Sequence, residues 1–308
     1  MSPAGKAGVV HLVDASYFVF RAYHSLPAHL ADADGEPTHA LFGFALFLLD
    51  LLDGVRPERI AVAFDESLGG EASYRNSIYP AYKANREAAP PGLAQQFAHC
   101  RELCRVLGLA ECASARYEAD DLIGTLAAAA RAAGLKSVLV TRDKDLAQLV
   151  REGDVFWDPA ARARYGYEEI AARFGALPER MADYLALTGD PVDNVPGVPG
   201  VGPKSAARLF AEFASLEDLY GNLGRVARLP IRGAARLARS LAAHETDAYL
   251  ARSLTSIVCD LPGVPSLDEL RPRAVDPAIG AFLEERGLSA MLRARVERVA
   301  MRRLGDCA

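Results

Sequence analysis

Three acidic residues fall within four positions at the start of an alanine-rich run, in the stretch RYEADDLIGTLAAAA at 116–130. Because like charges this close together repel one another, some interaction must offset the repulsion. Carboxylates at a helix N-terminus can cap free N–H groups and interact favourably with the helix dipole, each for about 0.3–1 kcal/mol. A divalent cation is the alternative, since Mg²⁺ binds several oxygen ligands held close together. Both interpretations of Glu118, Asp120 and Asp121 are open at this point.

Aspartates also follow three apolar runs that predict β-strands. Asp14 ends the run VVHLVD and Asp65 ends IAVAFD, while Asp143 and Asp145 come shortly after KSVLVT. In a parallel α/β sheet the carboxyl ends of the strands lie at one edge, where the functional crevice is found. A single aspartate at such a position is more often a helix cap. Three strand ends with the same feature instead predict a cluster of carboxylates.

The spacing of the acids supports a shared site. Glu118 and Asp121 are three residues apart and share a helix face, and Asp190 and Asp193 in LTGDPVDN have the same spacing. The predicted cluster comprises nine residues: Asp14, Asp65, Glu118, Asp120, Asp121, Asp143, Asp145, Asp190 and Asp193. So many buried charges would be very costly without cations. Two Mg²⁺ or Mn²⁺ ions held by carboxylates are the usual apparatus for phosphodiester cleavage, and a ligand set without His or Cys argues against zinc.

The overall charge is compatible with a nucleic-acid partner. The chain has 308 residues, of which 51% are hydrophobic and 24% charged, and its net charge is −5. Nine fewer negative charges would take this value to +4, so the acidity is concentrated in the candidate site. The five cysteines show no CxxC spacing, and an odd number without a secretory leader predicts a reduced, cytoplasmic protein. The apolar run at 40–52 contains Asp50 and is too short to span a membrane comfortably, so it predicts a buried helix and no membrane partner.

Alternating strand and helix patterns predict the scaffold of the site. Strands are expected at 9–14, 59–65 and 136–141, with a further strand or edge at 154–159, and helices up to 52, at 92–109 and from 121 to about 134. This pattern indicates an α/β fold with a mostly parallel sheet flanked by helices. From about 175 onward the pattern is almost entirely helical. We therefore predict an α/β domain at 1–175 and a helical region at 176–308, without internal repeats.

Two further segments have the composition of phosphate-binding elements. NVPGVPGVGPKSAARLF at 194–210 places a glycine-rich hairpin before a helix, where backbone N–H groups can bind a phosphate beside Lys204. Its glycines permit close approach; they are Gly197, Gly200 and Gly202. A plain loop between two helices is the alternative.

The other segment, YRNSIYPAYKANR at 74–86, interleaves cations with aromatic rings that can stack on unpaired bases. Its cations are Arg75, Lys83 and Arg86, and its tyrosines include Tyr82. A solvated amphipathic helix is the alternative for this segment. Arg21, a short helix after Asp14, could face the same site.

Six segments together resemble the 5′-3′ exonuclease/flap endonuclease family. LVDASYFVFRAYHSLP, VAFD, YRNSIYPAYKANR, YEADDLIGTLA, TRDKDLAQLV and LTGDPVDNVPGVPGVGPKSA have that family's order and spacing, from about residue 9 to 260. The sequence is most similar to the bacterial branch, which includes the N-terminal nuclease domain of DNA polymerase I. The resemblance implies a PIN-like, Rossmann-like α/β domain with a helix-hairpin-helix (H3TH) subdomain.

The resemblance also implies roles for individual residues. The nine acids match the family's positions around two divalent ions, and Lys83 and Arg86 match basic residues that stabilise the scissile phosphate, with Tyr82 beside them. Arg21 matches a phosphate-contacting arginine. Lys83, Arg86, Asp120 and Asp143 are expected to act in catalysis. Residues 66–91 correspond to a helical arch, and the hairpin at 194–210 to a duplex-binding module that holds K⁺ in some members.

The implied activity is structure-specific hydrolysis of DNA by a two-metal-ion mechanism in replication or repair. Expected substrates are 5′ flaps, nicked or gapped duplexes and 5′ ends, and the protein is expected to be a monomer with a functional link to a DNA polymerase. Met1 and the residues beyond 260 favour a stand-alone nuclease over part of a polymerase. Departures from the family pattern at 65–73 and 86–96 leave the balance of exonuclease to flap cleavage open. The alternatives are a PIN-like ribonuclease and a catalytically silent DNA-binding protein.

Overall fold

A computed structural model describes residues 8–66, 73–87, 89–90 and 92–306. The chain divides into two compact units, and each unit is assembled from separate stretches of sequence. The first unit comprises 1–68, 88–142 and 258–308, and the second comprises 69–87 and 143–257. The predicted boundary at 175 lies inside the second unit, at the glycine where a helix ends with a φ of 97°.

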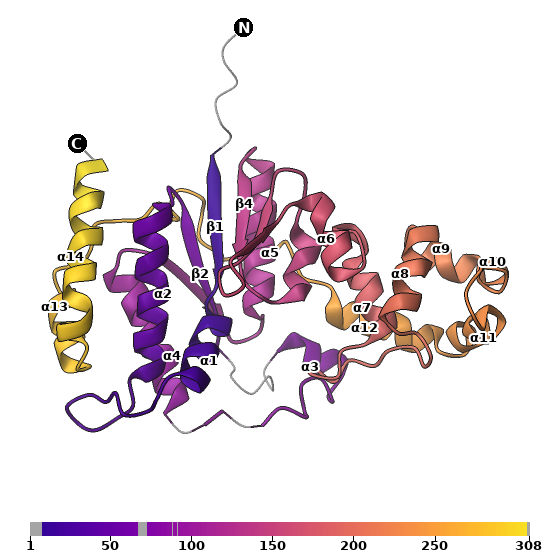
Figure 1. The fold of residues 1–308 in the computed structure, drawn as a ribbon, viewed down its shortest axis with the longest axis horizontal. Helices are drawn as coiled ribbons and strands as arrows, with labels where there is room; N and C mark the ends of the chain where they lie inside the picture. The colour runs from indigo at the N-terminus through magenta and orange to yellow at the C-terminus, as the bar shows by residue number, and fades with distance from the viewer. Residues whose placement is uncertain (1–7, 67–72, 88, 91, 307–308) are drawn as a thin grey trace, which may run out of the picture. The chain divides into compact units, whose positions relative to one another are not determined.

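Four parallel strands form the sheet of the first unit (Figure 1). They are β1 (Val9–Asp14), β2 (Ile60–Asp65), β3 (Ala110–Ser114) and β4 (Lys136–Val140), in the order β3-β2-β1-β4. Strands β1 and β2 are almost wholly buried, as apolar runs covered on both faces should be. The predicted strands at 9–14, 59–65 and 136–141 are confirmed. Strand β3 was missed because AECAS is short and polar, with only Cys112 fully buried.

Helices cover both faces of this sheet. They are α1 (Ala15–Ser25), α2 (His39–Val55), α4 (Leu93–Val106) and α5 (Ala119–Ala132), with α13 (Ile279–Glu285) and α14 (Ser289–Asp306) near the C-terminus. Helix α5 packs against all four strands, and Figure 1 shows α2 on the opposite side of the sheet. The apolar run at 40–52 is a buried helix, as predicted. Its Asp50 pairs with Arg295 of α14, and no helix in the described residues is long and apolar enough to cross a membrane.

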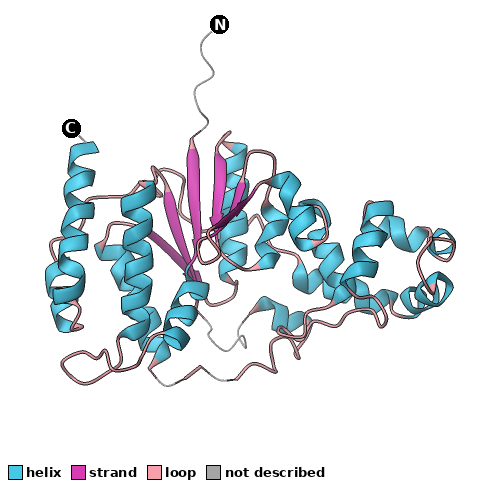
Figure 2. Cartoon of the chain, viewed as in Figure 1, coloured by secondary structure: helices cyan, strands magenta, loops and turns pink. Residues whose placement is uncertain are grey.

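The second unit is mainly helical (Figure 2). Its elements are α3 (Tyr74–Ile78), η1 (Lys144–Leu149), the antiparallel hairpin β5 (Val155–Asp158) and β6 (Ala163–Tyr165), α6 (Tyr167–Phe174), η2 (Pro178–Arg180), α7 (Met181–Thr188), α8 (Pro203–Glu212), α9 (Leu216–Gly221), α10 (Leu223–Val226), α11 (Ala234–Ala243) and α12 (Glu245–Thr255). Strand β5 confirms the predicted strand or edge at 154–159. Residues 67–72, 88 and 91 of the predicted arch lie outside the described residues. The rest of that segment contains α3 and a series of turns at 80–86.

One buried side chain of α4 satisfies the N-terminus of α2. Thr38 precedes α2 without making a side-chain capping bond. The Oε1 atom of Gln96 instead accepts hydrogen bonds from the N–H groups of Ala40 (2.7 Å) and Leu41 (3.3 Å). Helix N-termini leave N–H groups without intrahelical partners, so this contact replaces a local cap and joins α2 to α4.

Replacing Gln96 with leucine should therefore lower the free energy of unfolding by about 1–3 kcal/mol, because two buried N–H groups lose their acceptor. The neighbouring Gln95 is exposed on the same helix and serves as the matched control. We expect Q95L to change this free energy by less than about 0.5 kcal/mol. Chemical denaturation measures both, and equal stability of the two variants would contradict the capping role.

Candidate active site

Two carboxylates of the first unit stand at the ends of adjacent parallel strands. Asp14 ends β1 and is buried, and its Oδ2 accepts a hydrogen bond from Thr141 Oγ1 at 2.8 Å. Asp65 ends β2, and its Oδ1 accepts a hydrogen bond from the N–H of Ala119 at 2.8 Å. Because Asp14 is in register with Ala63, both aspartates belong to one edge of the sheet. The hydrogen bond to Ala119 joins that edge to the first turn of α5.

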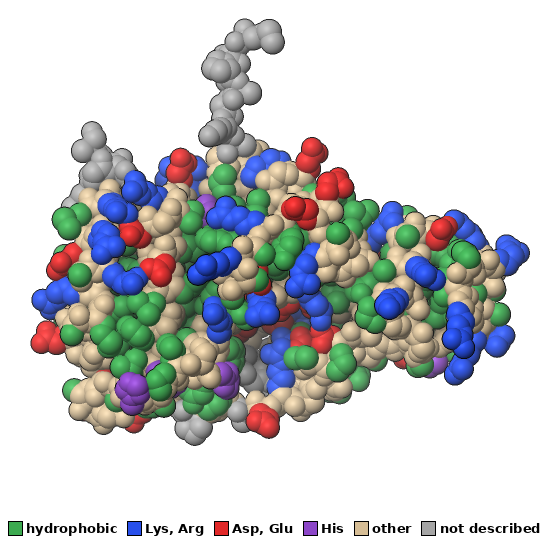
Figure 3. Space-filling view, viewed as in Figure 1, with side chains coloured by type: hydrophobic (Ala, Val, Ile, Leu, Met, Phe, Trp, Pro, Cys, Tyr) green, Lys and Arg blue, Asp and Glu red, His purple; other side chains and the backbone are tan. Residues whose placement is uncertain are grey.

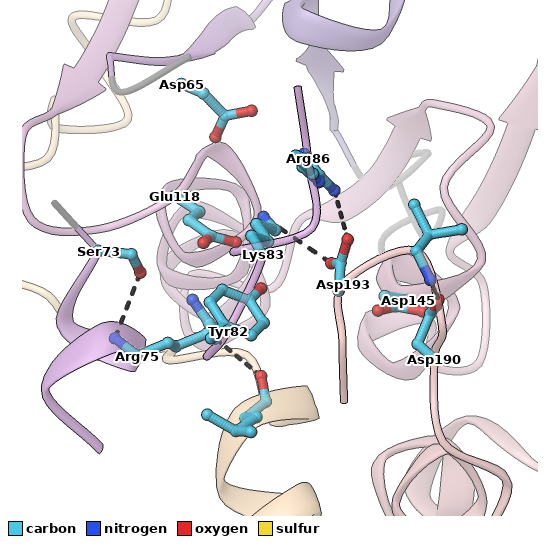
Figure 4. Close-up of polar contacts among 12 residues, drawn as sticks. Asp65, Ser73, Arg75, Tyr82, Lys83, Arg86, Glu118, Asp145, Asp190 and Asp193 are labelled. Carbon is cyan, nitrogen blue, oxygen red and sulfur yellow. Dashed lines mark hydrogen bonds and ion pairs between the residues drawn. The ribbon is translucent and has the colours of Figure 1, made fainter. Parts of the chain in front are cut away.

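The first turn of α5 brings the other acids of this unit to the same edge. Glu118 is the N-cap residue and lies beside Asp65 (Figure 4). Asp121 is fully buried, and its two oxygens accept the N–H groups of Glu118 (3.2 Å) and Val258 (2.9 Å). The capping interpretation thus accounts for Asp121. Glu118 and Asp120 are half-buried in the same turn.

The second unit holds the acids that follow β4. Asp143 caps η1, and its Oδ1 accepts the N–H of Asp145 at 2.9 Å. The Oδ1 atom of Asp145 is buried and has no hydrogen-bond donor among the described residues. Burial, and then the negative charge of Asp143, raise the pKa of Asp145 well above its usual range. A buried carboxylate oxygen without a donor is a position that a cation would stabilise, so Asp145 fits a divalent metal ligand.

Cations already neutralise the two acids of the loop 190–195. Lys144 Nζ lies 2.7 Å from Asp190 Oδ2. Burial alone would raise the pKa of Asp190, but the hydrogen bond from Lys144 outweighs it and the pKa is lowered. Asp193 lies between Arg86, with which it forms an ion pair, and Lys83, whose Nζ is 3.8 Å from Asp193 Oδ2 (Figure 4).

Hydrogen bonds to backbone carbonyls join the basic segment, residues 74–86, to the same loop. The N–H of Lys83 donates to the carbonyl of Asp193 at 2.9 Å, and Asn194 Nδ2 donates to the carbonyl of Ala81 at 2.6 Å. Asn85 Nδ2 donates to the carbonyl of Pro191 at 2.7 Å. Lys83 and Asn194 both have left-handed backbones, with φ values of 56° and 54°. Such strain persists only where surrounding contacts impose it, and it is common at functional sites.

Sequence reasoning missed both asparagines of this contact. Asn85 and Asn194 are ordinary polar residues within two loop motifs, and neither motif contains a signal that it meets the other. The tolerance of Asn for the left-handed region was the one hint available, and it does not specify a partner.

Other predicted DNA-binding residues occupy different environments. Arg75 is buried, and its guanidinium donates to the carbonyls of Leu254 (2.8 Å) and Ser256 (3.0 Å), which holds α3 against the end of α12. Tyr82 is also buried, with Lys83 Nζ 5.0 Å from its ring centroid. Arg21 is exposed on α1 of the first unit. The side chain of Arg75 therefore has a structural task, and its contact with DNA stays a prediction.

The glycines of the hairpin differ in what they contribute. A Cβ on Gly197 would lie 2.6 Å from the backbone C and O atoms of Thr188, so close packing against the end of α7 requires this glycine. Gly200 has a φ of 84°, and the space beside it is open. Gly202, the N-cap of α8, also faces open space, and Lys204 is exposed in the first turn. Gly200, Gly202 and Lys204 are thus accessible to a ligand.

The nine predicted metal ligands are distributed over both units, five in the first and four in the second. Within the parts of the chain that the structure describes, no three His, Cys, Asp or Glu side chains are grouped to hold one ion. The assignment of all nine acids to a two-ion site stays a prediction. Its structural support is the position of Asp14 and Asp65 at one edge of the sheet beside the first turn of α5, and the buried oxygen of Asp145.

Comparisons with known proteins match nearly the whole chain. The family model for the 5′-3′ exonuclease N-terminal resolvase-like domain matches residues 9–175, and that for the 5′-3′ exonuclease C-terminal SAM fold matches 176–278. DNA polymerase I of Rhizobium leguminosarum is 38% identical over 276 residues, which are 85% of this chain and 27% of that protein. Thermostable DNA polymerase I of Thermus filiformis is 37% identical over 286 residues, 92% of this chain and 32% of that protein. The chain therefore spans about a third or less of the length of these relatives.

Solved structures confirm the predicted fold class. T5 5′-exonuclease with bound divalent metal ions (zinc) aligns with a TM-score of 0.64 and 20% identity, over 81% of this chain and 90% of that one. The catalytic core of Rad2 in complex with DNA substrate aligns with a TM-score of 0.56 and 17% identity, over 91% of this chain and 88% of that one. At these identities the likeness concerns the fold: a parallel α/β sheet with helices, followed by a helical part.

Replacing Gly197 with alanine should lower the free energy of unfolding by about 1–3 kcal/mol, since its Cβ would collide with the backbone of α7. Gly202 is the control in the same hairpin, because its surroundings are open and its φ of −98° suits any residue. We expect G202A to cost less than about 1 kcal/mol. Thermal and denaturant unfolding test this difference. If G197A were as stable as G202A, the close packing described here would be wrong.

Proposed function

This chain belongs to the 5′-3′ exonuclease family, and we propose that it is an Mg²⁺-dependent, structure-specific 5′ nuclease acting on DNA. The observation that carries the proposal is the sheet edge of the first unit. There Asp14 and Asp65 end adjacent strands, and Asp65 binds the first turn of the helix that begins after Glu118. Gathered carboxylates at the carboxyl ends of parallel strands are suited to hard divalent cations.

The chemistry divides between bound ions and basic side chains. Two divalent ions would supply an activated water and stabilise charge during in-line attack on the phosphodiester. The protein's own cations, Lys83 and Arg86, stabilise negative charge on the phosphate. Because both now pair with Asp193, the substrate phosphate competes with that carboxylate for them. The products of such a reaction carry a 5′-phosphate and a 3′-hydroxyl.

Family membership supports a requirement for divalent metal ions. The identity of the ion is argued from the ligands of this chain. The matching T5 5′-exonuclease structure contains divalent metal ions, described as zinc. We assign Mg²⁺ to this chain, with Mn²⁺ as a substitute, because its candidate ligands are carboxylates. K⁺ at the hairpin is a further prediction, which would use backbone carbonyls of the segment 194–203.

DNA as the substrate follows from the hairpin as well as from the family. Gly200, Gly202 and Lys204 present exposed backbone and a cation at the start of α8, which suits a duplex backbone and carries no sequence readout. Replication or repair is the proposed setting, with 5′ flaps, nicks, gaps and 5′ ends as substrates. We further propose a cytoplasmic monomer that works together with a DNA polymerase.

A ribonuclease and a silent DNA-binding protein are the competing functions. A ribonuclease would use the acidic α/β half and has no evident need for the hairpin before α8. A silent binding protein would keep the hairpin, but the buried oxygen of Asp145 without a donor would then be a cost with no function. The following two experiments distinguish all three.

Replacing Asp145 with asparagine should lower the cleavage rate about 10²–10³-fold, because a predicted ion ligand is lost. Duplex affinity measured in EDTA should stay within about threefold of wild type. The variant should also unfold at a higher temperature in EDTA, since it removes a buried charge that has no donor. Asp260 is exposed, and D260N is the charge-matched control with wild-type values throughout. Undiminished cleavage by D145N would refute the ion assignment.

Removal of the metal gives the second test. With Mg²⁺ we expect cleavage near the junction of a labelled 5′ flap on duplex DNA, at least about tenfold faster than cleavage of the same strand without a complement, because the hairpin binds duplex. EDTA should abolish cleavage and leave binding, and added Mg²⁺ should restore it. Binding without cleavage under all conditions would favour the silent protein. Cleavage confined to single-stranded RNA would favour the ribonuclease.

A further inference from the structure

A cavity of about 540 Å³ lies within the second unit, between the hairpin and α11. Gly200 and Ser205 line the side formed by the hairpin and α8. Arg236 and Ser240 of α11 line the other side, together with Arg232 in the turn before that helix. None of the α11 residues was assigned a function by sequence reasoning.

The contacts around this cavity fix its shape. Ser240 Oγ donates a hydrogen bond to the carbonyl of Pro199 at 2.5 Å, which ties α11 directly to the hairpin. Leu237 of α11 is buried and also lines the cavity. Arg236 and Ser240 are one helical turn apart and share a face of α11, while Arg232 lies in the turn just before this helix and lines the same cavity.

Both arginines are available for an external anion. Arg232 and Arg236 are exposed, and within the described ranges neither forms an ion pair. Among the residues that the structure describes, no acidic residue lines the cavity. The segment 226–243 contains four arginines and no acidic residue. Lys and Arg side chains gather over this end of the second unit in Figure 3.

The side chains that line the cavity favour phosphate as the bound anion. Two guanidinium groups and the Ser205 hydroxyl supply donors for phosphate oxygens, and guanidinium groups bind phosphate in bidentate geometry. The open space beside Gly200 lets a bulky backbone approach the hairpin. The hydrophobic residues of the lining are Pro199 and Leu237, and its charged and hydroxyl side chains are Arg232, Arg236, Ser205 and Ser240.

We propose that this cavity is a second phosphate-binding site for the backbone of duplex DNA, with Arg232 and Arg236 as its ligands. The inference rests on the proposed function and extends the duplex contact from the hairpin to α11. The two guanidinium groups neutralise phosphates on the strand that passes the hairpin, without reading its sequence. Helix α11 thus lengthens the duplex footprint of the second unit.

The test is the salt dependence of binding by the full chain to a 5′-flap duplex, measured in EDTA so that no cleavage occurs. Each phosphate contact contributes about −0.9 to the slope of log K against log salt concentration. The double variant R232Q/R236Q should therefore have a slope less negative by about 1.8, which corresponds to roughly 60-fold weaker binding at 0.1 M salt if the affinities are equal at 1 M. R232K/R236K should restore the slope, because it keeps both charges.

R239Q is the matched control, because Arg239 is exposed on the same helix, has no ion-pair partner among the described residues and does not line the cavity. Its slope should equal that of the wild type. If R239Q changed the slope as much as R232Q or R236Q alone does, the inference would be overturned in favour of a diffuse charge effect. A wild-type slope for R232Q/R236Q would also overturn it, while flap cleavage by the wild type would leave the proposed function intact. Thermal unfolding of each variant checks that the fold is unchanged.

Discussion

Electrostatic repulsion between acidic residues at one edge of the sheet is the constraint on which the proposed active site depends. In the first unit, hydrogen-bond donors offset it: Thr141 donates to Asp14, Ala119 to Asp65, and Val258 to Asp121. Each donor lies at or beyond the end of a strand or helix, so the contacts that compensate the charges also join the ends of these elements. The acids therefore help to fix the structure of the sheet edge. Bound divalent ions would neutralise the negative charge that these hydrogen bonds only partly offset.

The second unit offsets the same repulsion with its own cations. Lys144 neutralises Asp190, and Lys83 and Arg86 surround Asp193. These pairs place the basic segment and the loop before the hairpin in one arrangement, and Asn85 and Asn194 reinforce it with backbone contacts. The left-handed backbone at Lys83 and Asn194 shows that the arrangement is imposed by these contacts. In the proposed nuclease the cations that face the scissile phosphate are thus held in place by acids before the substrate arrives.

The proposed recognition of duplex DNA depends on the contacts that hold the hairpin and α11 in place. The hairpin is held against α7 by the close approach at Gly197, and α11 is tied to the hairpin by Ser240. These contacts leave Gly200, Arg232 and Arg236 facing one cavity. A rigid frame that exposes backbone and unpaired cations is suited to a phosphate backbone and carries no preference for sequence.

Apolar runs and helical periodicity were enough to predict the strands β1, β2 and β4 and the helices α2, α4 and α5, because such patterns fit few other secondary structures. The sequence also determined the family, through six motifs in a fixed order. Strand β3 escaped detection, since AECAS is short and pairs only because β2 lies beside it. Tertiary structure alone decided that Gln96 caps α2, that Arg75 is buried, that Asp193 holds Lys83 and Arg86, and that α11 meets the hairpin. Residues 83 and 193, like residues 200 and 236, are far apart in the sequence and come close only when the chain folds. Local sequence patterns therefore do not predict that they lie together.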